Sequence, residues 1–461
     1  MKKHQGLRTQ VRRLGLECDY SCGLLNSKTV LMGRPHIILL LAMVSAASMW
    51  CYADFILVPY QEAEAARSGR PRGNLSDLYP RWLGARELLL HGRDPYSPEI
   101  TREIQAGYYG RVLDPARQGD PKDQQAFAYP VYVTFVLAPT VRLPFSMVQK
   151  GFRWWLIALT VATIPMWLRL GGWRISWVSQ LAWMMFVLGS YPAVQGIKLQ
   201  QLTLLVCGLI AGCGAALSSG YFVLAGILLA ITTIKPQLAG IVCAWLGIWV
   251  ISDWRQRQWF GWSFITTMLL LLTGSELVLP GWMGRFRGAV SAYWQYTGEG
   301  KTVLDVALGP TTGKIVTWCM VLVVGVLCWQ RRKEPAGSEG FAMSFCLIMA
   351  LTLVVIPTYA PYNQLLLLPA LIAIVEAANA IWQKGRLNRL FLGVATVTIF
   401  WPWIAAIILD LLLLGLPRAQ VGKAWWLPLY TSLAIPVAVL GVLLLAVQST
   451  ATKAHAVESS H

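Results

Sequence analysis

The segment 221–251 reads YFVLAGILLAITTIKPQLAGIVCAWLGIWVI, and it decides the fold class of this chain. Lys235 is the one charged residue in the 31-residue run. An apolar run of about 18 or more residues is long enough to cross a membrane, and this one leaves no polar face for a soluble helix. Pro236 in its middle leaves two possibilities, one broken and tilted helix or two short ones.

Similar runs recur along the chain, which has 461 residues, 56% of them hydrophobic and 13% charged. We therefore expect an all-α protein, a polytopic transmembrane helical bundle with 12 or 13 spans. The expected spans are 36–58, 127–144, 152–170, 177–194, 199–217, 221–251, 260–279, 312–329, 342–357, 361–381, 389–414 and 425–447.

The net charge of +17 does not indicate a nucleic-acid partner, because the basic residues lie in tails and loops between apolar runs. We expect membrane lipids as partners instead. The basic residues before position 35 favour a cytoplasmic N-terminus and an uncleaved first span in the cell membrane. With that orientation the basic residues at 255–257, 331–333 and 384–389 face the cytoplasm, which favours a single crossing at 221–251. Arg169 and Arg174 then fall on the outer side.

Residues 59–126 follow the first span and contain ten basic and ten acidic residues, which is typical of a folded, solvated element. Near the start of their stretch NLSDLYPRWLGARELLLHGRDPYSPE (74–99) stand Ser76 and Asp77, either of which can cap a helix. Apolar residues then recur at helical spacing, so we expect an interfacial helix with its apolar face on the outer membrane surface. Gly92 is expected to end it, and 94–96 to form a turn.

Asp77 has two interpretations, either a helix cap and nothing more or a functional acid that Arg81, one turn later, keeps ionised. Lys235 is either a snorkelling side chain or a functional cation, and its depth in the run favours function. Two further polar groups start apolar runs on the expected outer side. The first is Tyr129-Pro130. The second is a hairpin within 356–369 that contains Tyr359, Tyr362, Asn363 and Gln364. The alternative interpretation of this hairpin is an aromatic belt at the membrane interface.

An acid at the surface, a cation within the membrane, and surrounding hydroxyls and amides suit a polar headgroup carried on a lipid. A cation pairs with phosphate, an acid takes a proton from an attacking hydroxyl, and tyrosines and amides hold sugar hydroxyls. The sequence shows no glycine-rich nucleotide loop, no metal-ligand cluster and no serine or cysteine nucleophile motif. We therefore expect neither a cofactor nor a metal.

With these features in this order, the chain resembles the GT-C membrane glycosyltransferases of glycosyltransferase family 87, also called DUF2029. The resemblance runs from about residue 36 to 380. It rests on the acid-led outer helix at 77–96, the Tyr129-Pro130 pair followed by Pro139 and Leu143-Pro144, a Gly-Gln-type segment at 200–203, the Lys235-Pro236 pair and a late outer hairpin. The best-known members are polyprenol-phosphate-mannose-dependent α-mannosyltransferases.

The resemblance implies a GT-C membrane domain over 36–380, between a cytoplasmic tail at 1–35 and C-terminal spans at 381–447, with a second tail at 448–461. It implies that a hexose, mannose in the best-known members, passes with inversion from a polyprenyl-phosphate donor to a lipid or glycan acceptor on the outer face. Asp77 is then the general base and Lys235 neutralises the donor phosphate. Arg81, Tyr129, Gln201, Tyr359 and Asn363 are expected to bind the donor.

This chain departs from the family pattern at three points. The Gly-Gln segment reads Gln200-Gln201-Leu202-Thr203, without the glycine. The late hairpin lacks the histidine that relatives often carry. The expected spans also place Gln201 on the inner side, unless 177–217 is a re-entrant pair or Gln201 is structural.

Two other functions remain open. A transporter or flippase for lipid-linked sugars predicts internal symmetry and charges along a path, but the sequence shows no internal repeat. A polymerase or ligase resembling those of O-antigen synthesis predicts a late outer loop with essential arginines. The 280–311 loop contains Arg285 and Arg287 and keeps that alternative open, and its Tyr293, Trp294 and Tyr296 are candidates for stacking against an acceptor.

Overall fold

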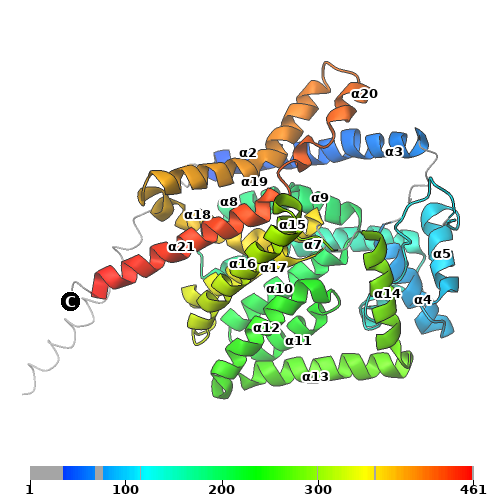
Figure 1. Cartoon of the computed structure of the whole chain (residues 1–461), viewed down its shortest axis with the longest axis horizontal. Helices are drawn as coiled ribbons and strands as arrows, with labels where there is room; N and C mark the ends of the chain where they lie inside the picture. The colour runs from blue at the N-terminus through cyan, green and yellow to red at the C-terminus, as the bar shows by residue number, and fades with distance from the viewer. Residues whose placement is uncertain (1–34, 68–75, 115, 298–299, 358–359, 459–461) are drawn as a thin grey trace, which may run out of the picture.

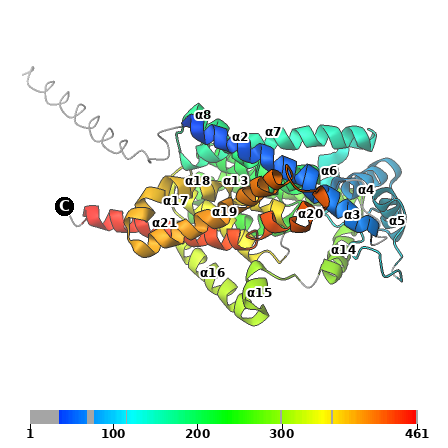
Figure 2. The ribbon, with the colours of Figure 1, turned by 90° about the horizontal axis from the view of Figure 1, so that it is seen from above.

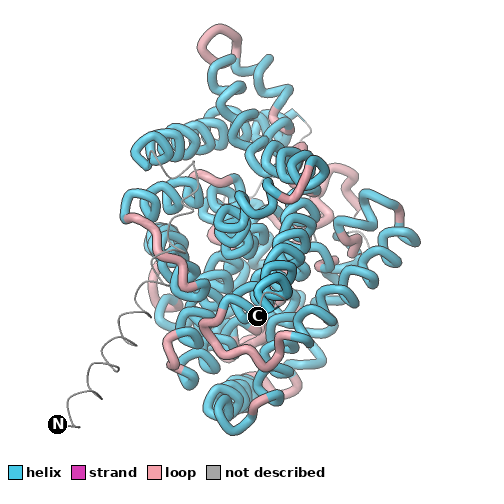
Figure 3. Tube along the Cα trace, turned by 90° about the vertical axis from the view of Figure 1, so that its left-hand side faces the viewer, coloured by secondary structure: helices cyan, strands magenta, loops and turns pink. Residues whose placement is uncertain are grey.

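The computed structural model of this chain describes residues 35–67, 76–114, 116–297, 300–357 and 360–458, with side chains described to 447 except at 296 and 297. Over these residues the protein consists of helices and connecting loops and contains no strand (Figure 3). The expected all-α fold is confirmed for this part of the chain. Tyr359 lies outside the described residues.

Seven helical segments are long and apolar enough to cross a membrane, which indicates a multi-pass membrane protein. They are Pro35–Arg67, Phe145–Gly171, Trp254–Val278, Pro310–Gln330, Pro361–Gln383, Arg386–Leu412 and Arg418–Val447. Five shorter apolar helices lie among them, Trp177–Leu188, Leu202–Ser218, Phe222–Thr232, Pro236–Ser252 and Glu339–Val355.

The first long helix is continuous from α2 (Pro35–Tyr52) through a π-helical turn (Ala53–Leu57) to α3 (Val58–Arg67). After it come α4 (Leu78–His91) and α5 (Pro98–Tyr109), which lie at one end of the molecule together with α14 (Trp282–Thr297), on the right in Figure 1. The expected folded element between the first two apolar runs is thus present.

Helix α4 buries its apolar face against the rest of the protein. The Trp82 indole donates to the Thr140 carbonyl at 3.2 Å, and its ring packs 5.2 Å from that of Phe145. Gly84 lies directly over Phe127, where a Cβ atom would come within 2.4 Å of the ring. The expectation that this face rests on the membrane surface is therefore wrong. Gly92 ends the helix with φ 64°, as expected.

The segment 127–144 is not the membrane span that the sequence predicts. It contains only the short helix α6 (Val133–Leu137) and one 3₁₀ turn (Ala138–Thr140). Pro139 and Pro144 lack the backbone N–H that a continuing helix needs, so no long helix forms before α7 (Phe145–Gly171). The segment instead forms a wall between α4 and the membrane helices, since Tyr132 donates to the Thr233 carbonyl at 2.9 Å.

The next segment consists of α8 (Trp177–Leu188), α9 (Tyr191–Lys198) and α10 (Leu202–Ser218). Gly189 lies at the break between α8 and α9 and contacts α2, where a Cβ atom would come within 2.2 Å of Ala46 Cα. Lys198 at the end of α9 pairs with Asp54, just before α3. Together α8 and α9 therefore carry the chain to the end of the bundle where α3 begins.

The segment 221–251 forms two helices, α11 (Phe222–Thr232) and α12 (Pro236–Ser252). Its two ends lie beside the same loop, because Ser252 donates to the Arg332 carbonyl at 2.6 Å and a Cβ atom on Gly337 would lie 3.5 Å from Ser218 O. The single crossing favoured by the charge pattern is therefore wrong, and the two-helix alternative is confirmed. Lys235 occupies the turn between the helices.

The remaining chain surrounds this pair. It comprises α13 (Trp254–Val278), α15 (Val303–Leu308), α16 (Pro310–Gln330), α17 (Glu339–Val355), η5 (Pro361–Leu367), α18 (Leu368–Gln383), α19 (Arg386–Leu412), α20 (Arg418–Val421), η6 (Gly422–Ala424), η7 (Leu427–Leu429) and α21 (Ala434–Glu458). Helices α10 and α17 are buried along most of their length and form the core. Seen from above, α15 and α16 lie at the lower edge of the molecule (Figure 2).

Candidate functional site

One cavity of about 470 Å³ lies between α4, the segment before α6, the turn before α12, α14 and the end of α17. Six of the seven site residues expected from the sequence line it. They are Asp77, Arg81, Tyr129, Gln201, Lys235 and Asn363. These residues are separated by up to 286 positions in sequence, since 363 − 77 = 286, so the fold has brought distant segments together. The seventh, Tyr359, falls outside the described residues.

Asp77 stands at the N-cap position of α4, but its side chain makes no capping hydrogen bond. The Gln201 side-chain amide instead donates to Asp77 Oδ2. The Asp77 backbone N–H donates to the Leu199 carbonyl at 3.0 Å, which fixes α4 against the α9–α10 connection. The interpretation of Asp77 as only a helix cap is therefore wrong. The expected spans placed Gln201 and Asp77 at opposite ends of the bundle, and their contact corrects that separation.

Burial raises the pKa of the Asp77 carboxyl above its ordinary value of 3.8. The charge of Asp123 acts in the same direction. The charges of Arg81 and Lys235 and the hydrogen bond from Gln201 act in the opposite direction. Because a general base works best when its pKa approaches the working pH, this carboxylate is better suited to accepting a proton than an exposed aspartate.

Lys235 lies deep in the cavity and is only 4% exposed. Its Nζ donates to Gln201 Oε1 at 3.1 Å and to Thr203 Oγ1 at 2.6 Å, and Thr203 donates in turn to Asn363 Oδ1 at 3.1 Å. The snorkelling interpretation does not fit, since every one of these partners lies inside the protein. A buried lysine held by neutral groups retains the capacity to attract an anion.

Arg81 and Tyr129 form the wall beside Asp77. The Arg81 guanidinium donates to the Asp77 carbonyl at 2.5 Å and lies 4.8 Å from the centre of the Tyr129 ring. Lys235 Nζ lies 5.8 Å from the centre of the same ring and 5.3 Å from that of Tyr362. Aromatic faces stabilise both cations without neutralising them, so positive charge remains available in the cavity.

Backbone strain concentrates at this site. Among the described residues, the non-glycine residues with positive φ are Gln125, at 51°, and Gln200, at 45°. Gln125 lines the cavity, and Gln200 directly precedes Gln201. Non-glycine residues adopt this conformation at an energetic cost and gather at functional sites, so both positions support a functional cavity here.

The sequence reasoning missed Asp123 and Gln125, which line the cavity from the loop after α5. They belong to a charged stretch without hydrophobic periodicity. Their closeness in sequence to Tyr129-Pro130 was the one feature that could have marked them as site residues. Helix α14 contributes Arg287, Tyr293 and Trp294, two of which the sequence had offered as acceptor contacts. Among the described residues there is no group of three or more His, Cys, Asp and Glu side chains suited to holding a metal ion.

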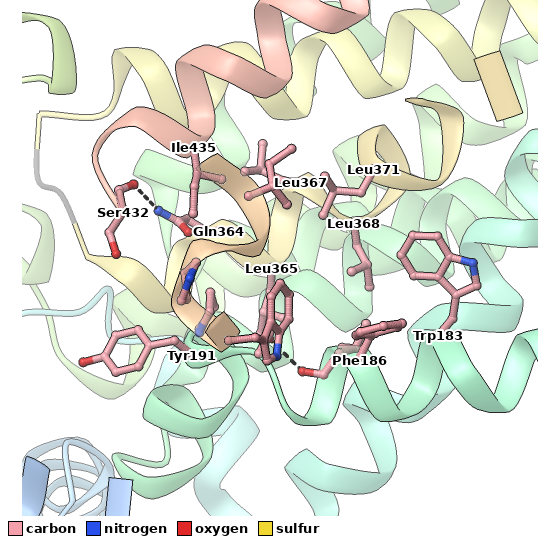
Figure 4. A pocket seen from close by; sticks show the side chains of 16 residues that line it. Trp183, Phe186, Tyr191, Gln364, Leu365, Leu367, Leu368, Leu371, Ser432 and Ile435 are labelled. Carbon is pink, nitrogen blue, oxygen red and sulfur yellow. Dashed lines mark hydrogen bonds between the residues drawn. The ribbon is translucent and has the colours of Figure 1, made fainter. Parts of the chain in front are cut away.

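A second, smaller cavity of about 80 Å³ lies between α8, η5, α18 and α19 (Figure 4). Its lining is mostly apolar, and none of the expected site residues lies there. Gln364, whose side chain donates to the Ser432 carbonyl at 2.6 Å, lines this cavity, and the preceding residue Asn363 lines the main one. The residues expected to take part in the reaction therefore line the larger cavity.

The main cavity combines one buried carboxylate and a deep lysine, which are joined by the side-chain amide of Gln201. Such an arrangement can take a proton from a hydroxyl beside a bound anion. Comparisons of the chain with protein-family models, with curated proteins and with solved structures find no match.

Proposed function

We propose that this chain is an integral membrane glycosyltransferase of the GT-C type. It transfers a hexose from a polyprenyl-phosphate donor to a lipid or glycan acceptor, with inversion. The observation that carries the proposal is the side chain of Gln201, which donates to Asp77 and accepts from Lys235. One amide thus sets a proton acceptor and an anion-binding cation at a fixed separation within a single cavity.

In the proposed reaction Asp77 takes the proton of the acceptor hydroxyl. The acceptor oxygen forms a bond with the anomeric carbon of the sugar while the bond from that carbon to the phosphate oxygen breaks. The polyprenyl phosphate leaves with the electron pair of the broken bond, and Lys235 stabilises its charge. Because a phosphate leaves readily, the scheme requires no general acid.

The path of the chain supports an outer-face site. Arg169 donates to Ser219 Oγ at 3.0 Å, and Arg257 donates to the Arg332 carbonyl at 2.9 Å. These contacts show that the loops with basic residues lie together at one end of the bundle, whereas the cavity lies beside α4 and α14. By the positive-inside rule we assign the basic end to the cytoplasm, together with the N-terminus, and the cavity to the outer face of the cell membrane. Together the seven long and five shorter helices then give twelve passes.

The test is sugar transfer in native membranes supplied with radiolabelled polyprenyl-phosphate mannose. Wild type should label a glycolipid, and Asp77→Asn at equal protein level should lose about 10²- to 10⁴-fold in rate, the usual contribution of a general base. Asp114→Asn is the matched control, because Asp114 lies exposed in the same outer element and does not line the cavity. Transfer by Asp77→Asn at the wild-type rate would refute the assigned base. If the wild type transfers no label, polyprenyl-phosphate mannose is not its donor.

A polymerase or ligase of lipid-linked sugars is the second candidate, because Arg287 of α14 lines the same cavity. Such an enzyme would join lipid-linked glycans into longer products and would depend on that arginine. Gel analysis of the labelled product distinguishes the two functions. A single added hexose favours the first, and a ladder that Arg287→Met abolishes favours the second.

A further inference from the structure

Asp123 is a second carboxylate in the main cavity, beside Asp77, and the proposed mechanism gives it no task. It is half-buried in the loop between α5 and α6. Its two carboxylate oxygens accept hydrogen bonds from a single residue, from the Gln125 backbone N–H at 3.0 Å and from the Gln125 side-chain amide at 2.7 Å. An ionised carboxylate has about four acceptor positions, so two remain for a ligand.

The surrounding loop holds this carboxylate in place. Gln105 of α5 donates from its side-chain amide to Gln124, to the backbone oxygen at 3.2 Å and to the side-chain oxygen at 2.8 Å. Tyr109 of α5 donates to the Asp123 carbonyl at 2.8 Å. Contacts from α5 therefore flank the carboxylate, and the strained Gln125 holds it from the other side. Strain of this kind persists where the surroundings fix a functional group.

The position differs from that of Asp77 in ways that matter for chemistry. Asp77 accepts from Gln201, whose side chain also holds Lys235, whereas Asp123 lies in the loop between α5 and α6 and is held there by Gln125. Tyr293 and Trp294 of α14 line the cavity with it and offer aromatic faces to a ring. A fixed carboxylate with free acceptor positions, an amide and aromatic rings make a combination suited to a sugar.

We propose that Asp123 contacts substrate by accepting hydrogen bonds from hydroxyl groups of the donor sugar, while Lys235 holds the donor phosphate. This inference rests on the proposed function and adds the group that recognises the sugar. Asp123 transfers no proton in the reaction. Hydrogen bonds to a charged group are the stronger kind, so the contact contributes mainly to donor affinity.

The experiment measures the binding of two short-chain probes to the purified full-length protein in detergent. One probe is an isoprenyl phosphate that carries mannose, and the other is the same isoprenyl phosphate without the sugar. Wild type should bind the mannosylated probe at least tenfold more tightly. Asp123→Asn should lose about 10- to 100-fold for the mannosylated probe. It should bind the sugar-free probe as well as wild type or better, since a negative charge is removed near a phosphate site.

Asp114→Asn, on the same loop but outside the cavity, is the matched control and should bind both probes as wild type does. Asp123→Asn overturns the inference if it weakens both probes equally, which indicates a role in loop folding, or if it weakens neither. A Km for the mannosylated donor raised by Asp123→Asn, with little change in kcat, gives a second readout of the same contact.

The two proposals fail in distinguishable ways. If wild type transfers mannose and Asp123→Asn keeps its donor Km, only the sugar contact is refuted. If wild type neither transfers mannose nor prefers the mannosylated probe, the proposed function is refuted and the sugar contact with it. If Asp123→Asn abolishes kcat while Asp77→Asn retains it, the two carboxylates exchange roles and both assignments are wrong.

Discussion

At the scale of single residues, the backbone of Gln200 explains how the segment 200–203 keeps its turn although the expected glycine is absent. The family that the chain resembles has glycine before the glutamine, and here that position has φ 45°, where glycine is favoured. The Gln200 side chain is fully buried and donates to the Ile197 carbonyl at 2.8 Å, which closes the turn locally. The left-handed turn that glycine would supply is therefore present without it, and Gln201 still reaches Asp77.

The electrostatics of Asp77 predict how activity should depend on pH. With Asp77 in its proposed role as general base, activity should be full above its pKa and fall as pH drops through it, because only the ionised carboxylate accepts a proton. Because burial raises that pKa, the acidic limb should lie above 3.8. Arg81 opposes the rise, so Arg81→Met should raise the pKa further and move the limb to higher pH, while Arg81→Lys should leave it close to wild type.

The measurement is kcat/Km for sugar transfer across pH in wild type and both variants. Lys235, Asp123 and Gln201 also act on the Asp77 carboxyl and remain unchanged in each protein. A limb that stays at the same pH in Arg81→Met would show that another group limits the rate. A limb that moves to lower pH would contradict the sign of the argument.

At the scale of elements, sequence reasoning identified apolar segments well and misjudged where they break. It placed 127–144 as a span because its residues are apolar, although its prolines leave only the five-residue helix α6. It favoured one crossing for 221–251 because charge counting outweighed Pro236. Composition measures how well a segment tolerates lipid, but a helix continues only where each backbone N–H finds its partner. Turns set by tertiary contact, such as Gly189 against Ala46, leave no local pattern.

The joint between α12, α13 and the loop before α17 depends on one buried arginine. Arg257 is 4% exposed and donates to backbone carbonyls of four residues, Trp249, Arg332, Lys333 and Glu334. Lysine has the charge but not the planar fork that reaches several acceptors at once. Arg257→Lys should therefore destabilise the protein by roughly 1–3 kcal/mol, since the buried cation keeps its charge but loses several of these hydrogen bonds.

Thermal unfolding in detergent, followed by the exposure of buried cysteines such as Cys328, measures this effect. Arg255→Lys is the matched control, because Arg255 is exposed at the start of the same helix. Equal apparent midpoints for the two variants would mean that the Arg257 contacts contribute little to stability.

At the scale of the whole molecule, the two misjudged segments offset each other. In the proposed topology, removing the crossing at 127–144 and adding one within 221–251 leaves the total at twelve passes but reverses the direction of every segment between them. Gln201 thereby moves to the end of the bundle that contains Asp77, and Arg169 joins the loops that contain Arg257 and Arg332. The order of the motifs along the chain grouped the site residues, but the expected spans separated Gln201 from the others, because the two breaks were misplaced.

This reversal can be tested with single cysteines in a chain whose native cysteines are replaced by serine. Arg174 lies exposed between α7 and α8, and the expected spans place it on the same side as Asp114 of the outer element. The structure places it instead at the end of the bundle with Lys333, because the neighbouring Arg169 contacts Ser219. A membrane-impermeant maleimide applied to intact cells should therefore label Asp114→Cys but neither Arg174→Cys nor Lys333→Cys. The latter two should react only after permeabilisation. Labelling of Arg174→Cys together with Asp114→Cys in intact cells would restore the sequence-derived path and contradict the arrangement of α8 to α12 on which the shared cavity depends.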